Sequence, residues 1–192
     1  MIQKQKKQLK KSFYEVEAPA TSTKIHLYAS SPEELEGKVA KIDLTRSLKG
    51  KSFELELRIK IDDKKIHAEP ESLALTSSYV RKVMRHGTDY CEDSFSAECR
   101  DHVVRIKPFL IARKRVSRAV LKALRETAKK YITAYIKTRT ANELFSDIIS
   151  NKLQKQLVLH LKKVYPLALC EIRVFQIVSP KKTEGKESEK QT

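Results

Sequence analysis

Alternation of apolar and charged residues predicts strands through the first half of the chain. The clearest run extends from Lys51 to Ile61, where every second residue is apolar: Phe53, Leu55, Leu57, Ile59 and Ile61. A period of two buries one face of a strand and leaves the other charged, as in an antiparallel sheet. Residues 24–29, 39–44 and 65–69 predict further strands, and Pro70 is expected to stop the last of them.

Helical periodicity appears later, and it is separated from most of the strands. Helices are predicted at 76–86 and 113–135, and two more follow Thr140, whose spacing to Glu143 fits a capping box, and Ser150. Strands are predicted at 90–97, 103–111 and 169–178. Segregated strands and helices favour an α+β fold, with an antiparallel, barrel-like sheet and about four helices packed against it.

The predicted helix from Arg113 to Tyr135 has a basic face and an apolar face. Its apolar positions are Val116, Val120, Ala123, Leu124, Thr127 and Tyr131. Its basic stripe recurs every three or four residues, and it comprises Lys114, Arg118, Lys122, Arg125 and Lys129, widened by Arg113, Arg115 and Lys130. Glu126 is the only acid between Arg113 and Lys130. Like charges at this spacing repel, so the pattern favours a polyanionic partner over a merely solvated face.

The charge of the whole chain changes the picture in the same direction. Its 192 residues include 40 Lys and Arg against 24 Asp and Glu, a net charge of +16. Such an imbalance indicates an anionic partner. A second basic group, Arg81, Lys82 and Arg85, lies on the helix predicted at 76–86. The first residues form a basic arm expected to follow phosphates, with Lys4, Lys6, Lys7, Lys10 and Lys11. Few aromatic residues argue against a stacking surface for single strands.

The predicted organisation is a basic N-terminal arm at 1–12, one α+β RNA-binding domain at 13–179, and a disordered polar tail at 180–192. No apolar run approaches the ~18 residues of a membrane span, and the N-terminus does not resemble a secretory signal. The chain is therefore expected to be soluble and intracellular.

No catalytic or metal-binding motif is found. The sequence has three cysteines and no CxxC motif. We interpret them as reduced, buried thiols: Cys91, Cys99 and Cys170. An acidic group could hold magnesium in a nuclease, but it is interpreted as a solvated loop face: Asp89, Glu92, Asp93, Glu98 and Asp101. We therefore predict no catalytic residue, no metal, no cofactor and no enzyme.

Several stretches resemble one family of small-subunit ribosomal proteins from archaea and eukaryotes, the eS-one family, also called S-three-A-e. The opening Phe13 to Pro19 is similar to its aromatic-Tyr-x-Val-x-Ala-Pro signature, and Leu35 to Val39 to its Leu-x-Gly-Arg-Val segment. Further matches in the same order are Val80-Arg81-Lys82, Asp101 to Arg105, Ser117, Leu124-Arg125, Lys129-Lys130, Asn142-Glu143-Leu144 and Tyr165-Pro166-Leu167. The family's arginine before the lysine pair is Ala128 here, so the resemblance carries no phosphate contact at that position.

The resemblance implies a structural protein of the platform of the small ribosomal subunit, near the 3′ end of its RNA. The implied partners are small-subunit ribosomal RNA and neighbouring platform proteins, with messenger RNA near the exit and initiation factors as further partners, and no membrane. It implies a ribosomal location in the cytoplasm, with transient nucleolar or nuclear assembly in a eukaryote.

Two other functions use the same basic helix. One is a free regulator that binds messenger RNA or DNA, and sedimentation with small subunits would distinguish it from a ribosomal protein. The other is a helix that docks on an acidic protein or an anionic membrane. The absence of Trp and Phe on the apolar face counts against the membrane.

Overall fold

The structure is a computed structural model that describes residues 11–18, 21, 23–48, 50–62 and 65–180. This part of the chain contains nine strands, one short 3-10 helix and four α-helices. The elements of the first half are β1 (Ser12–Ala18), β2 (Thr23–Ala29), η1 (Pro32–Leu35), β3 (Val39–Asp43), β4 (Phe53–Asp62) and β5 (Lys65–Leu75). Those of the second half are α1 (Ser77–Val83), β6 (Tyr90–Glu92), β7 (Phe95–Glu98), β8 (His102–Ala112), α2 (Arg118–Lys137), α3 (Ala141–Ile149), α4 (Lys152–Leu161) and β9 (Leu167–Pro180).

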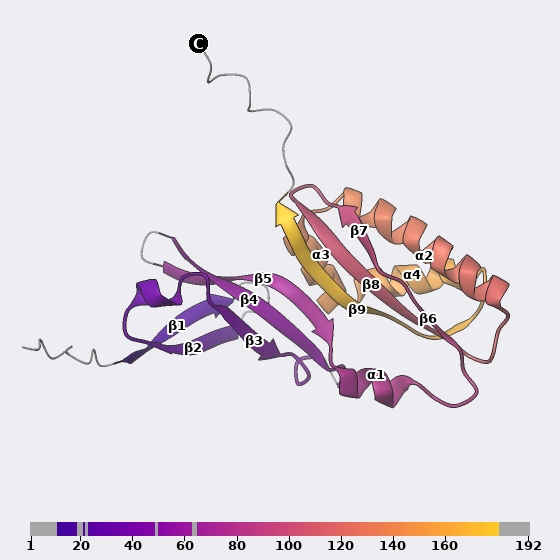
Figure 1. Cartoon of the computed structure of the whole chain (residues 1–192), viewed down its shortest axis with the longest axis horizontal. Coiled ribbons are helices and arrows are strands. Elements are labelled where there is room, and N and C mark those ends of the chain that lie inside the picture. Colours follow the sequence, from indigo (N-terminus) through magenta and orange to yellow (C-terminus); the bar gives the residue numbers. More distant parts are fainter. Residues whose placement is uncertain (1–10, 19–20, 22, 49, 63–64, 181–192) are drawn as a thin grey trace, which may run out of the picture. The chain divides into compact units, whose positions relative to one another are not determined.

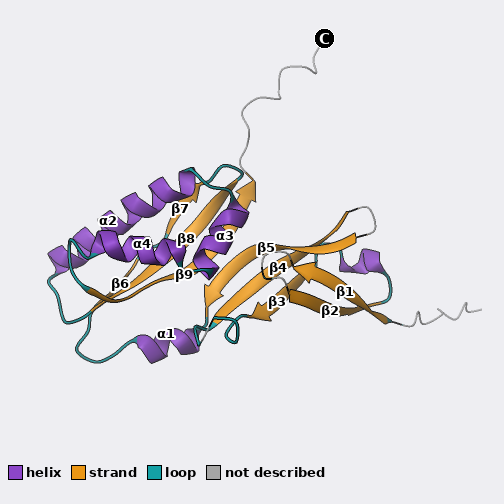
Figure 2. Ribbon diagram, turned by 180° about the vertical axis from the view of Figure 1, so that it is seen from behind, coloured by secondary structure: helices purple, strands orange, loops and turns teal. Residues whose placement is uncertain are grey.

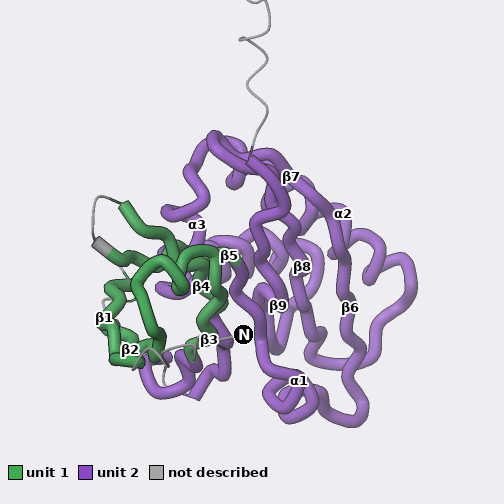
Figure 3. Tube along the Cα trace, turned by 60° about the vertical axis from the view of Figure 1, so that its left-hand side comes forward, with its two compact units in different colours: residues 1–42, 56–71 green, residues 43–55, 72–192 purple. Residues whose placement is uncertain are grey.

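The contacts of the chain divide it into two compact units, coloured separately in Figure 3. Unit 1 comprises residues 1–42 and 56–71, and unit 2 comprises residues 43–55 and 72–192. The long strands β4 and β5 contribute residues to both units. The domain boundaries expected at residues 12 and 179 stay predictions.

Unit 1 is built from β1, β2, β3 and the outer parts of β4 and β5. β1 and β2 form an antiparallel pair from Ser12 to Ala29, and β1 also makes a short parallel pairing with β5 at His67. The alternation read in β4 is confirmed, because its residues are alternately buried and exposed along most of the strand. A small core forms where Ala29, Leu35 and Ile59 meet partly buried neighbours. This unit is therefore a thin sheet with charged outer faces.

Unit 2 has a sheet covered by helices. β8 is its central strand and pairs with β9 on one side and with β6 and β7 on the other, while the last residues of β5 pair with β9. Helices α2, α3 and α4 cover one face of this sheet, as Figures 1 and 2 show from opposite sides. At the centre of the packing, the rings of Phe145 on α3 and Phe175 on β9 meet edge to face, with centroids 4.8 Å apart.

The sequence explains where each of the long helices begins. Ser117 caps α2 by accepting a hydrogen bond from the backbone N–H of Val120 at 3.4 Å. The predicted capping box of α3 is confirmed, since Thr140 and Glu143 each accept from the other's backbone N–H. The predicted Ser150 cap is wrong by one residue, because Asn151, in the left-handed conformation with φ 59°, precedes α4.

The α+β class and the four helices are as predicted, but the sheet is open. Among the described residues the strand order runs β2-β1-β5-β9-β8-β6, with β4 paired to β3 and β5 and with β7 paired to β8. The two ends of this order do not pair, so the barrel-like closure expected from the sequence does not occur. An open sheet also removes the need for the large shear that a closed barrel imposes.

Two strand predictions need correction. β5 continues through Pro70 to Leu75. On the side of β5 that carries β1 and β9, the recorded pairing with β1 is at His67 and that with β9 begins at Ser72, so Pro70 lies between these two partners. The strand expected at 90–97 is two strands, β6 and β7, with Asp93 and Ser94 between them. Pro108 lies at a register shift in β8.

The three cysteines are free and buried, as predicted. Burial raises the pKa of the Cys91 thiol to about 11, and burial together with nearby Glu171 raises that of Cys170. Both thiols are therefore protonated at neutral pH and poor metal ligands. Within the described ranges, no group of three or more His, Cys, Asp and Glu side chains is placed to hold a metal ion. None of the described helices is long and apolar enough to span a membrane.

Candidate nucleic-acid interface

Among the described residues, a group of exposed cations lies on α2 and on the segment before it. We call it the basic surface, and it comprises Arg113, Lys114, Arg115, Arg118, Lys122, Arg125, Lys129 and Lys130. All eight side chains are exposed. The recorded ion pairs of the described residues include one of them, Lys122, which lies 3.9 Å from Glu126. A contact of that length between exposed groups contributes little.

The helix begins later than the sequence pattern predicts. α2 starts at Arg118, so Arg113, Lys114 and Arg115 lie on the segment that joins β8 to α2 and not on a helical stripe. The buried face is also different: it comprises Leu124, Ala128, Ile132 and Ile136, whereas five of the six positions assigned to it are only partly buried. Charge periodicity placed the stripe correctly from Arg118 onward, but it did not reveal the Ser117 cap.

Helical geometry places four of these cations along one flank of α2. Arg118, Lys122, Arg125 and Lys129 follow steps of four, three and four residues, which keeps them on the same side. This flank faces β7, since the Lys129 ammonium lies 5.7 Å from the centre of the Phe95 ring. The opposite flank packs near α4, where the Tyr131 hydroxyl donates to Gln156 at 3.1 Å. The cations thus form a row along one edge of the helical layer.

Asp89 holds the segment that carries the first three cations. Its carboxylate accepts a hydrogen bond from the backbone N–H of Val116 at 2.9 Å, and its backbone carbonyl accepts from Ala112 at 2.9 Å. These two bonds fix the segment at both ends. Asp89 was assigned to an acidic loop face in the sequence, and its structural role lies instead in positioning basic residues.

Two other acids of that group also have structural partners. Glu92 accepts two hydrogen bonds from Arg173, at 2.5 and 2.7 Å, and Asp93 accepts from the backbone N–H of Ser94 at 2.8 Å. Because these carboxylates serve separate partners, they do not converge on a common ion. The interpretation as a nuclease centre is therefore not supported.

The local electrostatics of α2 are unfavourable without a partner. The N-terminal end of a helix carries a partial positive charge, and acidic residues normally occupy it. The first turn of α2 contains no acid, and Arg118 is its first residue. A polyanion at this end would interact favourably with both the helix dipole and the cations.

The second predicted group lies on and after α1. Arg81 and Lys82 are in the last turn of the helix, and Arg85 follows its end at Val83. All three are exposed, and none takes part in an ion pair recorded for the described residues. This helix is capped by Thr76, whose hydroxyl accepts a hydrogen bond from the backbone N–H of Tyr79 at 3.4 Å.

The predicted arm is only partly covered by the structure. Lys4, Lys6, Lys7 and Lys10 lie outside the described residues. Lys11 is exposed, and its ammonium lies 5.8 Å from the centre of the Tyr28 ring in unit 1. Its contribution to a nucleic-acid interface stays a prediction.

The sequence analysis missed further cations on α4 and after it. Lys155, Lys162 and Lys163 are exposed, and they are absent from the ion pairs recorded for the described residues. The Lys162-Lys163 pair was a visible signal in the sequence.

Lys51, in contrast to these exposed cations, is paired within the protein. Its ammonium is 2.5 Å from the buried carboxylate of Glu171 and donates to Asn151 at 2.7 Å. Burial raises the pKa of Glu171, although Lys51 opposes this effect.

These features define a class of protein: an α+β protein with an extended, unneutralised cationic surface and no assembled catalytic site in its described part. The sequence profile of the Ribosomal S3Ae family matches residues 2–180, so the chain belongs to that family. Because the family is one of ribosomal proteins, the chain is a structural component rather than an enzyme, as the sequence predicts.

Individual relatives are similar over nearly their full length. The small ribosomal subunit protein eS1 of Nanoarchaeum equitans is 26% identical over 178 residues, which cover 88% of this chain and 89% of the relative. The protein of the same name from Desulfurococcus amylolyticus is 26% identical over 183 residues, covering 91% and 86%. That of Methanothrix thermoacetophila is 26% identical over 179 residues, covering 88% and 84%.

Proposed function

We propose that this chain is a constituent of the small ribosomal subunit that binds and stabilises ribosomal RNA through its basic side chains. The family and the names of its relatives support the subunit. One structural observation carries the RNA contact: eight exposed cations share the basic surface with a single weak internal ion pair among the described residues. An excess of this kind favours the binding of an external polyanion.

The mechanism rests on phosphate positions rather than on base sequence. Each cation that neutralises a phosphate releases condensed counterions, so affinity falls as salt concentration rises. The major groove of an A-form helix is too deep and narrow for side chains to read. The row on α2 would follow one stretch of RNA backbone, and Arg81, Lys82 and Arg85 would contact a second stretch.

The finer location follows from the resemblance alone. It supports a place on the platform near the 3′ end of the small-subunit RNA, beside other platform proteins. Contacts with messenger RNA near its exit and with initiation factors stay predictions, as does nucleolar assembly.

The proposal is tested by the salt dependence of RNA binding. Replacing Arg118, Lys122, Arg125 and Lys129 by glutamine should flatten the log–log slope of affinity against salt by roughly three units, at about 0.7 to 0.9 per phosphate contact. Binding to a fragment of small-subunit ribosomal RNA is measured by fluorescence anisotropy at several salt concentrations.

Unit 1 offers a matched control with the same change in charge. Lys24, Lys41, Arg58 and Lys60 each pair with a carboxylate, and their replacement by glutamine should leave the slope nearly unchanged. Equal flattening by both sets would show that RNA responds to total charge only. An unchanged slope in the α2 variant would remove α2 from the interface.

Sedimentation separates this function from that of a free regulator. A subunit component migrates with small ribosomal subunits in a sucrose gradient and moves to the top after ribonuclease treatment. A regulator of messenger RNA or DNA would be found mainly outside the subunit fractions.

A further inference from the structure

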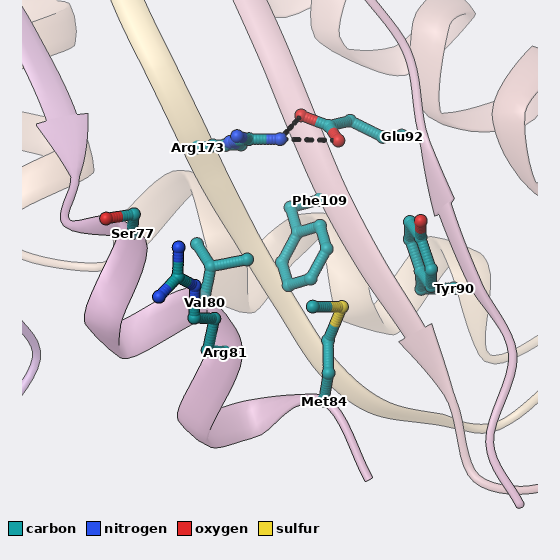
Figure 4. Close-up of a pocket in the computed structure, with 8 residues that line it drawn as sticks. All are labelled: Ser77, Val80, Arg81, Met84, Tyr90, Glu92, Phe109 and Arg173. Atoms are coloured by element: carbon teal, nitrogen blue, oxygen red, sulfur yellow. Dashed lines mark hydrogen bonds and ion pairs between the residues drawn. The ribbon is translucent and has the colours of Figure 1, made fainter. Parts of the chain in front are cut away.

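A cavity of about 240 Å³ in unit 2 is not used by the phosphate contacts described above. It lies between α1 and the strands β6, β8 and β9, and Figure 4 shows its lining: Ser77, Val80, Arg81, Met84, Tyr90, Glu92, Phe109 and Arg173. This volume is below the roughly 300 to 1,000 Å³ typical of sites for drug-sized ligands. It therefore suits one small group rather than a drug-sized ligand.

The floor and one wall of the cavity are apolar and partly aromatic. Phe109 is almost fully buried, whereas Tyr90 is 52% exposed and Met84 is 40% exposed. The rings of Tyr90 and Phe109 are tilted by 48°, with centroids 5.9 Å apart. An exposed aromatic ring and a flexible thioether next to a buried ring form a surface on which a flat aromatic ligand can stack.

Polar groups stand around this apolar surface. Arg173 and Glu92 are joined above Phe109 by hydrogen bonds from Nη1 alone, so Nε and Nη2 of Arg173 keep donors that can face a ligand (Figure 4). Arg81 and the Ser77 hydroxyl are on the α1 side. The lining thus offers donors, an acceptor and one cation in excess of the single carboxylate.

We propose that this cavity, bounded by Tyr90, Met84 and Phe109, receives one unpaired ribonucleotide base of the RNA, whose phosphate is contacted by Arg81. Unstacked bases in RNA loops and bulges commonly stack on aromatic side chains while their edges form hydrogen bonds. The excess of positive charge favours an anionic occupant over an apolar peptide, and the exposed Tyr90 ring beside Phe109 favours a flat base over the carboxylates of an acidic peptide. The inference rests on the proposed RNA-binding function and adds a contact to a base.

The site differs from the stacking surface that the low aromatic content excludes. A surface for single strands needs several rings in a row to hold successive bases. Here one exposed ring and one buried ring hold a single base within an otherwise phosphate-based interface. The base edge meets Glu92, Arg173 and Ser77, which introduces a local preference among bases.

The methionine content of the chain provides a direct probe. It has two methionines, Met1 and Met84, so a protein with ¹³C-labelled methionine methyl groups gives one signal from the cavity and one reference signal. The full chain is titrated with single-stranded hexanucleotides of A, C, G or U, and separately with a blunt RNA duplex. A stacked base should shift the Met84 methyl signal through its ring current, with saturation, whereas the duplex should leave it in place.

Two substitutions at one position separate stacking from folding. Tyr90→Leu removes the ring from a largely exposed position and should weaken hexanucleotide binding about tenfold, the order expected when one stacked base is lost. Tyr90→Phe keeps the ring and should bind like the parent. Neither change should alter the salt slope for the duplex, which measures the basic surface independently.

The possible results are distinct. A Met84 signal that stays in place while anisotropy shows that hexanucleotides bind would overturn the base site and leave the phosphate interface intact. A shift of equal size with the duplex would mean that the cavity responds to backbone charge, which also overturns it. If the unmodified protein bound neither the hexanucleotides nor the duplex, that result would instead contradict the proposed function.

Discussion

The two units contain the same kinds of charged residues but use them differently. In unit 1, Arg58 lies 2.6 Å from Glu71 and Lys60 lies 2.6 Å from Glu69, both across neighbouring strands. Lys24 and Glu15 form a similar pair at 2.8 Å on β2 and β1. In the basic surface of unit 2, the corresponding cations are exposed and have almost no internal partner. The difference shows that net charge alone does not locate an interface.

Strand alternation explains the pairing in unit 1. Charged residues at every second position of one strand face those of the next, so acids and cations can meet across the sheet. Such exposed pairs are worth only ~0–1 kcal/mol each, and their main effect here is local neutrality. On α2, the partners at three or four residues are mostly other cations. The positive charge of unit 2 is therefore free to act on an external anion.

The largest expected effect comes from the core beneath the basic surface. Ile132→Ala on α2 and Ile59→Ala on β4 both truncate a side chain that is at most 1% exposed. Each should lower the free energy of unfolding by about 2–5 kcal/mol, measured by chemical denaturation. Only Ile132→Ala should also weaken RNA binding, because it removes packing contacts between the core and α2, the helix that carries the cations.

The contrast between the two units would not hold if both variants, measured where they are fully folded, bound RNA as well as the parent protein. The cations would then act through their number and not through the way α2 presents them. An equal loss of RNA affinity in the Ile59→Ala variant would show instead that the paired charges of unit 1 contribute to the interface.

A smaller effect is expected at Asp89, which orders the segment with Arg113, Lys114 and Arg115. Asp89→Ala removes the acceptor for the Val116 N–H and should cost about 1–2 kcal/mol of stability. It should also lower RNA affinity although it removes a negative charge, since the segment loses its fixed path. Electrostatics alone predict the opposite sign, so anisotropy at low salt decides between them. Asp89→Asn keeps an acceptor oxygen and should restore much of the loss.

Local patterns were sufficient for much of this fold. The alternation in β4 and the capping box at Thr140 and Glu143 depend on residues close in sequence, and both predictions are confirmed. The exposure of the basic side chains was equally predictable, because Lys and Arg are seldom buried without a partner. Lys51 shows the limit of this rule, because its partner Glu171 is 120 residues away in the sequence.

Long-range contacts decide the features that the sequence analysis missed. Ala128 was considered only as a missing cation, yet it is fully buried, because α2 faces the sheet through Leu124, Ala128, Ile132 and Ile136. The cavity at Tyr90 and Met84 joins four elements, so no single segment carries its signal. The open sheet likewise depends on which strands pair, a property that hydrophobic period does not specify.

The smallest and most discriminating effect is the response of each unit to salt. Raising NaCl from 0.1 to 1 M shortens the screening length from ~10 Å to ~3 Å, which weakens attraction and repulsion alike. The amide of Leu121, bonded to Ser117 at 3.2 Å near the cations of α2, should gain a few tenths of a kcal/mol of protection from hydrogen exchange. The amide of Ile59, bonded to Lys38 at 2.9 Å between the paired charges of unit 1, should lose a similar amount. Shifts of the same sign at both amides would mean that salt acts on the stability of the whole chain, and the contrast between paired and unpaired charge would not hold.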